Sequence, residues 1–373
     1  MSKPRVVFVG WRLGGERERV IELGRERFDY TVVSMDLDER LRPLVDWRPL
    51  PKPGLGSFRL GWATFFTLGG LRLARLDADL IHSVGPMPIV PNHVDVNTVT
   101  FCHAAYDEAT AGNPLKGSSS TVGWRLGQRF TLALERWWFR RAVRVLIGIS
   151  EGSAADLRRF YPAVRVAAIP RGIDLRRFTP DDADGRRFRE EQGAQPDAVI
   201  ALFVDQQHRP LKGLDLAIEA FAASGRQGGG PDLLWVVGGG NEVHADLAAR
   251  FGVADRVRFL GYTSEVERCY RAADLFVLPT VYEAFCRAAH EAAACGLPVV
   301  APPVNGIREL VGNGEAGIVT RRDAADLARA LEELAGDPAR RARMGEVARR
   351  RALAFDEQHV AGRILALHDS LLG

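Results

Sequence analysis

The sequence contains little cysteine, little lysine and no long apolar run. Its four cysteines, Cys102, Cys269, Cys286 and Cys295, show no metal-ligand spacing, which argues against a zinc site. No stretch approaches the ~20 consecutive apolar residues of a transmembrane helix. The first residues lead straight into a predicted strand, with no signal peptide pattern. We therefore expect a cytoplasmic protein whose cysteines are buried free thiols rather than disulfides.

Lysine is scarce beside arginine, and charge is unevenly distributed. Four lysines accompany 46 arginines, and Lys212 is the single lysine after residue 180. Residues 1–180 carry a net charge of +9, and residues 181–373 carry −6. The basic half should therefore face an anionic partner, and the one lysine of the acidic half is worth inspecting as a binding group.

The length and composition are those of a two-domain globular protein. At 373 residues the chain is too long for one ordinary core. Its 46% hydrophobic and 26% charged residues are typical of a globular chain. Strand and helix patterns alternate through both halves, and they predict parallel α/β domains.

The most informative segment runs from Leu275 to Thr320. Asp274–Pro279 has the length and apolar content of a buried strand, and Arg287–Cys295 is rich in alanine and free of Gly and Pro, as a helix requires. Gly296 supplies the stop, and Leu297–Ala301 is predicted as the next strand. In such a βαβ unit the ligand lies beyond the carboxyl ends of the strands, where the free N–H groups of the helix can bind phosphate.

Two glutamates lie around the start of this helix. Glu283 falls in the loop, and Glu291 would lie about two turns into the helix if the helix starts near Ala284. One carboxylate could then accept hydrogen bonds from sugar hydroxyls and the other from a ribose. Alternatively, Glu291 and Arg287 form an ordinary exposed pair four residues apart, worth only ~0.3–0.5 kcal/mol. The spacing alone leaves both interpretations open.

This segment resembles the signature of the retaining glycosyltransferases of family 4, which have the GT-B fold. The family pattern is a strand ending in Pro-Ser, then Glu-Gly-Phe-Gly, then a second glutamate opening Glu-Ala-x-Ala-Cys-Gly-x-Pro-Val-Val. The chain has Pro279-Thr280, Glu283-Ala284-Phe285-Cys286 and Glu291-Ala-Ala-Ala-Cys-Gly-Leu-Pro-Val-Val300. The resemblance implies that these residues bind a nucleotide-sugar donor. Ala284 and Cys286 replace glycines, so we expect a narrower donor pocket or one shaped for an unusual sugar.

A second match surrounds Lys212. A predicted strand ends near Asp205, and a polar loop leads from it to Lys212-Gly213 and a helix. This resembles the family's Val-Gly-Arg-x(n)-Lys-Gly, whose Arg and Lys clamp the donor diphosphate through charge-assisted contacts. The lysine matches, whereas Asp205-Gln206 occupy the Gly-Arg positions. Arg209 is therefore our candidate substitute, and a solvated loop arginine is the alternative.

Three glycines and one histidine extend the resemblance. Gly239, within Gly238-Gly239-Gly240, follows a predicted strand as in the family's Val-Gly-x-Gly-x-Glu loop and would contact the donor. Gly14 and Gly15 follow the first strand and resemble the family's glycine-rich first loop, with a plain tight turn as the alternative. His103 follows an apolar strand, where the family's histidine hydrogen-bonds the transferred sugar; a structural histidine is the alternative.

Two further patterns have competing interpretations. Asp36-Leu-Asp38 is formally Asp-x-Asp, but it follows a strand of the first half. We interpret it as turn chemistry and expect neither a metal nor another cofactor. The basic and aromatic helix Leu134–Arg144 could lie on an anionic membrane, and packing on the sheet is the favoured alternative.

Together the ordered matches predict an α/β protein of GT-B fold, with two Rossmann-like doubly wound domains facing a central cleft. Residues 1–178, with a returning helix at about 360–373, would bind the acceptor, and residues 179–359 the donor. The resemblance implies retaining, metal-independent transfer of a hexose-type sugar from a UDP- or GDP-sugar to a hydroxyl of a small-molecule or lipid-linked acceptor. His103, Lys212 and Glu283 would be catalytic, and no nucleic acid is expected as a partner. The alternatives are a nucleotide-sugar 2-epimerase and a catalytically silent partner subunit.

Overall fold

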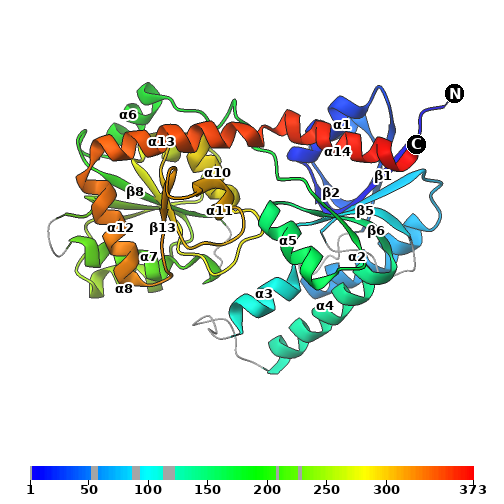
Figure 1. The fold of residues 1–373 in the computed structure, drawn as a ribbon, viewed down its shortest axis with the longest axis horizontal. Coiled ribbons are helices and arrows are strands. Elements are labelled where there is room, and N and C mark those ends of the chain that lie inside the picture. The colour runs from blue at the N-terminus through cyan, green and yellow to red at the C-terminus, as the bar shows by residue number, and fades with distance from the viewer. Residues whose placement is uncertain (1, 52–57, 86–92, 112–121, 207–209, 226–228) are drawn as a thin grey trace. The chain divides into compact units, whose positions relative to one another are not determined.

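The computed structural model describes residues 2–51, 58–85, 93–111, 122–206, 210–225 and 229–373. The chain divides into two compact units (Figure 1). The first unit comprises Met1–Glu108, Thr121–Gly172 and Glu357–Gly373, and the second comprises Ala109–Ser120 and Ile173–Asp356.

The first unit is built on a parallel sheet, seven-stranded within the described residues, in the order β3-β2-β1-β4-β5-β6-β7. The strands are β1 (Arg5–Leu13), β2 (Asp29–Leu37), β3 (Asp46–Pro49), β4 (Leu80–Val84), β5 (Val94–Val99), β6 (Val143–Gly148) and β7 (Arg165–Ala168). The helices are α1 (Glu16–Gly24), η1 (Glu39–Leu44), α2 (Phe58–Leu73), α3 (His103–Thr110), α4 (Val122–Arg141), α5 (Glu151–Phe160) and α14 (Glu357–Leu372). The strand order reverses between β1 and β4, which is the topological switch point where doubly wound sheets bind ligands.

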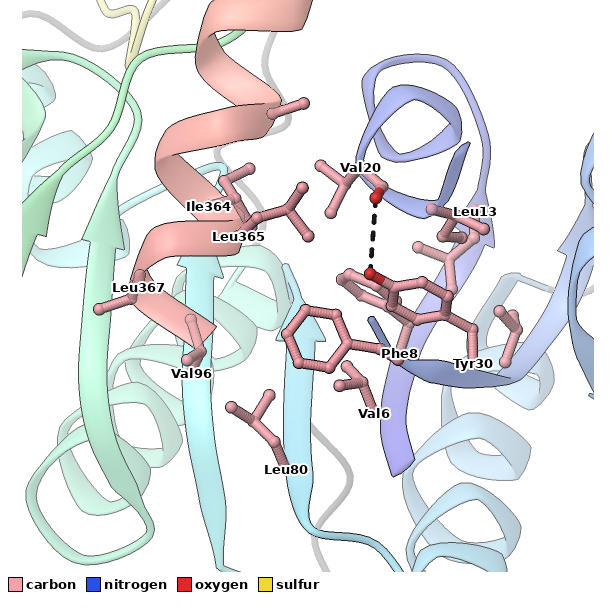
Figure 2. Close-up of a cluster of buried hydrophobic side chains, with 14 of the residues drawn as sticks. Val6, Phe8, Leu13, Val20, Tyr30, Leu80, Val96, Ile364, Leu365 and Leu367 are labelled. Carbon is pink, nitrogen blue, oxygen red and sulfur yellow. Dashed lines mark hydrogen bonds between the residues drawn. The ribbon is translucent and has the colours of Figure 1, made fainter. Parts of the chain in front are cut away.

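Helix α14 completes the core of the first unit although it follows the second unit in the sequence. Its Leu365 and Leu367 belong to the same buried cluster as Phe8 of β1 and Tyr30 of β2 (Figure 2). The Tyr30 hydroxyl donates a hydrogen bond to the Val20 carbonyl of α1 over 3.5 Å. Burial of each leucine contributes roughly 1.5–3 kcal/mol, so α14 is an integral part of this unit.

A pair of buried histidines joins α14 to the sheet. His82 Nδ1 of β4 lies 2.9 Å from His368 Nε2 of α14, and His82 Nε2 lies 2.8 Å from Thr98 Oγ1 of β5. Burial lowers the pKa of His368 to about 4 and holds the pKa of His82 well below its ordinary value. Both rings are therefore neutral at neutral pH.

The second unit has a parallel sheet, six-stranded in the part that the structure describes, in the order β10-β9-β8-β11-β12-β13. The strands are β8 (Ile200–Asp205), β9 (Leu233–Gly238), β10 (Val257–Gly261), β11 (Leu275–Val277), β12 (Val299–Ala301) and β13 (Gly317–Val319). The helices are α6 (Asp182–Glu191), η2 (Pro210–Lys212), α7 (Leu214–Ser224), α8 (Glu242–Arg250), α9 (Val266–Ala272), α10 (Arg287–Ala294), α11 (Ile307–Val311), α12 (Ala324–Gly336), α13 (Pro338–Ala352) and η4 (Leu353–Phe355). Every residue of β8 and β9 is buried, as in a sheet covered on both faces. Here the strand order reverses between β8 and β11.

All four cysteines are free and buried, as expected. Among the helices that the structure describes, none combines the length and apolar character needed to cross a membrane.

Candidate functional site

Two loops of the second unit meet at its switch point, beyond the carboxyl ends of β8 and β11. The Val281 N–H and the Thr280 hydroxyl both donate to the Leu211 carbonyl, over 2.8 and 3.1 Å. Gly213 has φ +75°, and a Cβ there would lie only 2.5 Å from the Pro279 carbonyl oxygen. The loop carrying η2 is therefore pressed against the loop that follows β11, and this contact fixes the position of Lys212.

Lys212 and Glu283 form an ion pair between these two loops. Their side chains are only 14% and 12% exposed, and Thr280 Oγ1 also lies 3.2 Å from Glu283 Oε1. Burial alone would lower the pKa of Lys212, but the charge and hydrogen bond of Glu283 raise it above its ordinary value. The ammonium therefore stays charged at neutral pH, and its remaining N–H donors suit an anionic ligand such as phosphate.

Cys286 has an unusual backbone conformation. With φ +62°, it is the single non-glycine residue of positive φ in the described chain. A left-handed residue with a Cβ costs about 1–2 kcal/mol, and the family pattern has a glycine at this position. The chain has thus kept the glycine conformation while changing the residue. Cys286 and Ala284 are 1% and 7% exposed, so a narrowing of the donor pocket by these side chains stays a prediction.

His290, which was not among the candidates predicted from the sequence, contacts this turn from the side of α10. Its Nδ1–H donates to the Cys286 carbonyl over 3.0 Å, and its ring stacks on Phe285 with centroids 3.9 Å apart. The Phe355 ring packs against the same ring in an edge-to-face arrangement, with ring centroids 4.5 Å apart. Burial lowers the pKa of His290 to about 4, so the ring is neutral. The Phe285 carbonyl packs closely against Gly306, where a Cβ would lie 1.9 Å from the carbonyl oxygen.

The helix α10 lies within the predicted range Arg287–Cys295, but it does not start near Ala284, which was the condition for placing Glu291 two turns into it. The left-handed Cys286 delays the helix until Arg287, so Glu291 lies just over one turn into it rather than two. Glu291 does pair with Arg287, whose Nε lies 2.7 Å from Oε1, but the glutamate side chain is 10% exposed against 54% for the arginine. The Tyr270 hydroxyl donates to Oε2 over 3.2 Å. Both carboxylate oxygens are therefore engaged in a nearly buried network.

The remaining donor-site candidates of this unit follow β8 and β9. The Gly239 N–H donates to the Asp205 carbonyl over 2.7 Å, which holds the glycine loop beside the end of β8. Gln206 Nε2 donates to the Thr263 carbonyl over 3.0 Å, so the residue at the family's arginine position ties two loops together. Arg209 lies outside the described residues.

The candidates of the first unit are His103 and the pair Gly14-Gly15. Gly15 precedes the first turn of α1 at the carboxyl end of β1, beside the switch point. His103 opens α3, and its Nδ1 lies 2.7 Å from Oε2 of Glu135 in α4. Sequence reasoning missed Glu135, because it considered this helix only for membrane contact or for packing on the sheet. Asp38 caps η1 by accepting from the Arg40 N–H over 3.2 Å, in line with turn chemistry.

A surface cavity of about 540 Å³ lies beside the edge strand β13, away from these candidates. Its rim arginine Arg340 is paired with Glu333. The cavity is lined by Arg308, Gly312, Asn313, Gly314, Gly317, Ile318, Val319 and Arg340. The site residues line no part of it, and we assign it no role.

Solved structures of similar fold define the class of protein. Sucrose-phosphate synthase from Thermosynechococcus elongatus superposes with a TM-score of 0.79 at 21% identity, over 99% of each chain. HepE from Anabaena, in complex with UDP and glucose, gives 0.73 at 19% identity, over 98% of this chain and 100% of that one. At these identities the likeness shows the fold alone. The expected GT-B architecture is confirmed.

Sequence comparison then identifies the family. The profile of "Glycosyltransferase Family 4" matches residues 18–177, and that of "Glycosyl transferases group 1" matches residues 184–351. A D-inositol 3-phosphate glycosyltransferase from Geodermatophilus obscurus is 38% identical, over 95% of this chain and 84% of that protein. The chain therefore belongs to glycosyltransferase family 4.

Proposed function

We propose that the protein transfers a hexose-type sugar from a UDP- or GDP-sugar to an acceptor hydroxyl, with retention of configuration. The observation that carries this proposal is the buried Lys212–Glu283 pair at the switch point of the second unit. A charged lysine beside a carboxylate offers donors for a diphosphate and acceptors for sugar hydroxyls in one place. In this proposal the second unit binds the donor and the first unit the acceptor.

Each candidate residue has a role in this scheme. Lys212 binds the diphosphate, joined by the backbone N–H groups of Phe285 and Cys286 at the start of α10. Glu283 accepts hydrogen bonds from the sugar, and Glu291 accepts one from the ribose while it keeps its bond to Tyr270. Gly239 lets the nucleotide approach the end of β9. Arg209 is the proposed second cation.

Stabilisation of the departing phosphate replaces a metal in the proposed mechanism. Lys212 and the N–H groups of α10 neutralise the charge that develops on the leaving nucleotide. The acceptor hydroxyl attacks from the same face, and the leaving phosphate takes its proton. We expect turnover to persist after treatment with EDTA; loss of turnover that Mg²⁺ or Mn²⁺ restores would overturn metal independence.

The acceptor is proposed to be a small anionic polyol. The relative from Geodermatophilus obscurus is named for D-inositol 3-phosphate, and the net charge of +9 over residues 1–180 supports an anionic acceptor on the first unit. Inositol 3-phosphate is therefore the first acceptor to test. Unphosphorylated inositol is the matched control, since it differs by the phosphate alone.

Thermal unfolding with a panel of nucleotides tests the donor assignment. UDP, GDP, UDP-glucose and GDP-mannose are compared, because a ligand that binds the folded state at about 100 times its Kd adds about 2.7 kcal/mol. One nucleotide series should stabilise wild type and R329A, a variant of an exposed arginine, but not K212A. No stabilisation by any member would favour a silent partner subunit. A new sugar nucleotide formed without acceptor would favour the epimerase.

We also propose that α4 contacts an anionic membrane surface. Phe130 and Trp137 are 63% and 40% exposed, and the exposed Arg129, Arg136 and Arg140 share their face of the helix. Aromatic and arginine side chains on one helix face suit a negatively charged bilayer interface. Wild type should sediment with phosphatidylglycerol vesicles more than with phosphatidylcholine vesicles, and W137S less than wild type. Equal sedimentation with both vesicle types would contradict the proposal.

A further inference from the structure

Glu135 is a buried carboxylate that the proposed reaction leaves without a role. Its Oε2 accepts hydrogen bonds from the backbone N–H of His103 over 2.8 Å and from the ring Nδ1 of His103 over 2.7 Å. Its Oε1 accepts from the Ala104 N–H over 3.2 Å and from the Tyr161 hydroxyl over 2.5 Å, and Cys102 Sγ lies 3.9 Å away. Donors thus surround both oxygens of a residue that is 5% exposed.

These hydrogen bonds fix the tautomer of His103. Burial alone would raise the pKa of Glu135, but the interactions with His103 and the Tyr161 hydroxyl hold that pKa below its usual value. Glu135 is therefore ionised at neutral pH, and an ionised carboxylate can only accept hydrogen bonds. Nδ1 must carry a proton, so the neutral ring has its lone pair on Nε2. The His103 side chain is 27% exposed, which leaves part of the ring accessible to a ligand.

We propose that Glu135 is a positioning residue, which holds His103 in the Nδ1–H tautomer so that Nε2 accepts a hydrogen bond from a hydroxyl of the bound sugar or acceptor. This inference rests on the proposed function, because it requires His103 to contact a substrate. It also gives that contact a direction, since the substrate hydroxyl must be the donor.

Capping of α3 is the structural alternative. Glu135 accepts from the first two backbone N–H groups of α3, at His103 and Ala104, and a carboxylate at a helix start is favourable without any further role. Capping accounts for the two backbone bonds, but it does not need the bond to the ring nitrogen. Only the positioning role requires a fixed tautomer.

The tautomer of His103 in the intact protein tests the proposal without any substrate. Long-range ¹H–¹⁵N spectra distinguish Nδ1–H from Nε2–H, and the H103N variant identifies the resonances by their loss. We expect the Nδ1–H form in wild type and a mixture in E135Q, whose amide donates as well as accepts. An Nε2–H form in wild type would overturn the proposal even if E135Q fails to fold. So would an unchanged tautomer in a folded E135Q.

Kinetics test whether the tautomer matters to the reaction, with UDP-glucose and GDP-mannose as probes. E135Q should lower kcat about 10- to 100-fold, the range found for partners that orient metal-ligating histidines, with little change in KM. The E135Q/H103N double variant should be no slower than H103N, because Glu135 acts only through His103. Y161F, which loses one bond to Glu135 but keeps the ring contact, is the matched control and should lower kcat much less than E135Q does.

Additive losses in the double variant, or a loss in Y161F equal to that in E135Q, would assign Glu135 to structure alone. If wild type turns over neither probe nor any other sugar nucleotide, the proposed function fails. The tautomer measurement still decides the geometric part of the inference in that case, so the two failures are distinguishable.

Discussion

The two units hold their polar site residues in different ways. In the second unit, Lys212 and Glu283 neutralise each other between two loops, and a left-handed turn at Cys286 follows them. In the first unit, the carboxylate of Glu135 accepts hydrogen bonds from the backbone and the ring of His103 at the start of α3. Part of the His103 ring stays exposed. A ligand of the second unit must join or open an existing ion pair. A ligand of the first unit meets a ring that is already oriented.

The largest expected effect comes from breaking the ion pair of the second unit. K212A should lower donor affinity or turnover at least tenfold, ~1.4 kcal/mol, because the diphosphate loses its cation. It should also lower the free energy of unfolding by roughly 3 kcal/mol, since Glu283 is left buried without a partner. Titration calorimetry and urea denaturation measure the two effects.

E291A should lower donor affinity or turnover by a similar factor of at least ~10. The Y270F variant is its control, because it removes a hydrogen bond to Glu291 and keeps the carboxylate. Unchanged kinetics in both K212A and E291A would contradict the assignment of the donor site to these residues.

Both units should lose stability in mild acid. His290 in the second unit and His368 in the first have pKa values of about 4, below the ordinary value of 6.5. Between these values the unfolded chain binds more protons, so stability is full above about pH 6.5 and falls as the pH approaches 4. Urea midpoints across this range measure the loss.

Substitution in one unit at a time separates the two contributions. H290F and H368F should each flatten the pH dependence, and each keeps an aromatic ring in its core position. If neither variant changes how the free energy of unfolding depends on pH, other groups cause the loss of stability in acid.

A smaller effect should appear at Cys286, where the usual order of alanine and glycine is inverted. At an ordinary site alanine is more stable than glycine by about 0.4–1 kcal/mol, but the left-handed backbone costs alanine about 1–2 kcal/mol. C286G should therefore be more stable than C286A by about 1 kcal/mol in urea denaturation. Both variants lack the thiol, so their difference isolates the backbone. Greater stability of C286A would show that the turn relaxes.

The smallest expected effect is that of R287A. The arginine is 54% exposed although Glu291 is only 10% exposed, and because water screens the arginine we expect a contribution at the level of a surface pair, about 0.2–1 kcal/mol. Its loss should change stability by less than K212A does and should leave donor affinity near wild type. A tenfold loss of donor affinity in R287A would instead make this arginine part of the phosphate site, in the place proposed for Arg209.

The sequence predicted the architecture because its signals are local. Buried strands, glycine stops and the ordered motifs around Lys212, Glu283 and Glu291 are each readable within a short window. The strand and helix patterns predicted parallel α/β domains, and the order of the motifs carried the resemblance to family 4 that implied the GT-B fold. The helix α10 was predicted to within one residue at each end, but the left-handed turn at Cys286 was not, because helix propensity says nothing of such a conformation.

The partners of the site residues were missed because they are distant in sequence or chemically silent. Glu135 lies 32 residues beyond His103 inside a helix whose other charges are basic, and only the fold brings the two together. His290 lies between Glu283 and Glu291 in the sequence. A histidine among alanines carries no pattern that distinguishes a residue bonded to the Cys286 carbonyl from an ordinary buried side chain. Tertiary contacts decide both cases.

The placement of α14 has a consequence for biosynthesis. The ribosome makes all of the second unit before it reaches the residues that pack on Phe8 and Tyr30. The second unit can therefore fold while the first still exposes an apolar surface beside β1 and β4, where Leu365 and His368 will later lie. Until α14 docks, that surface stays uncovered, so docking of α14 completes the core of the half of the chain that was made first.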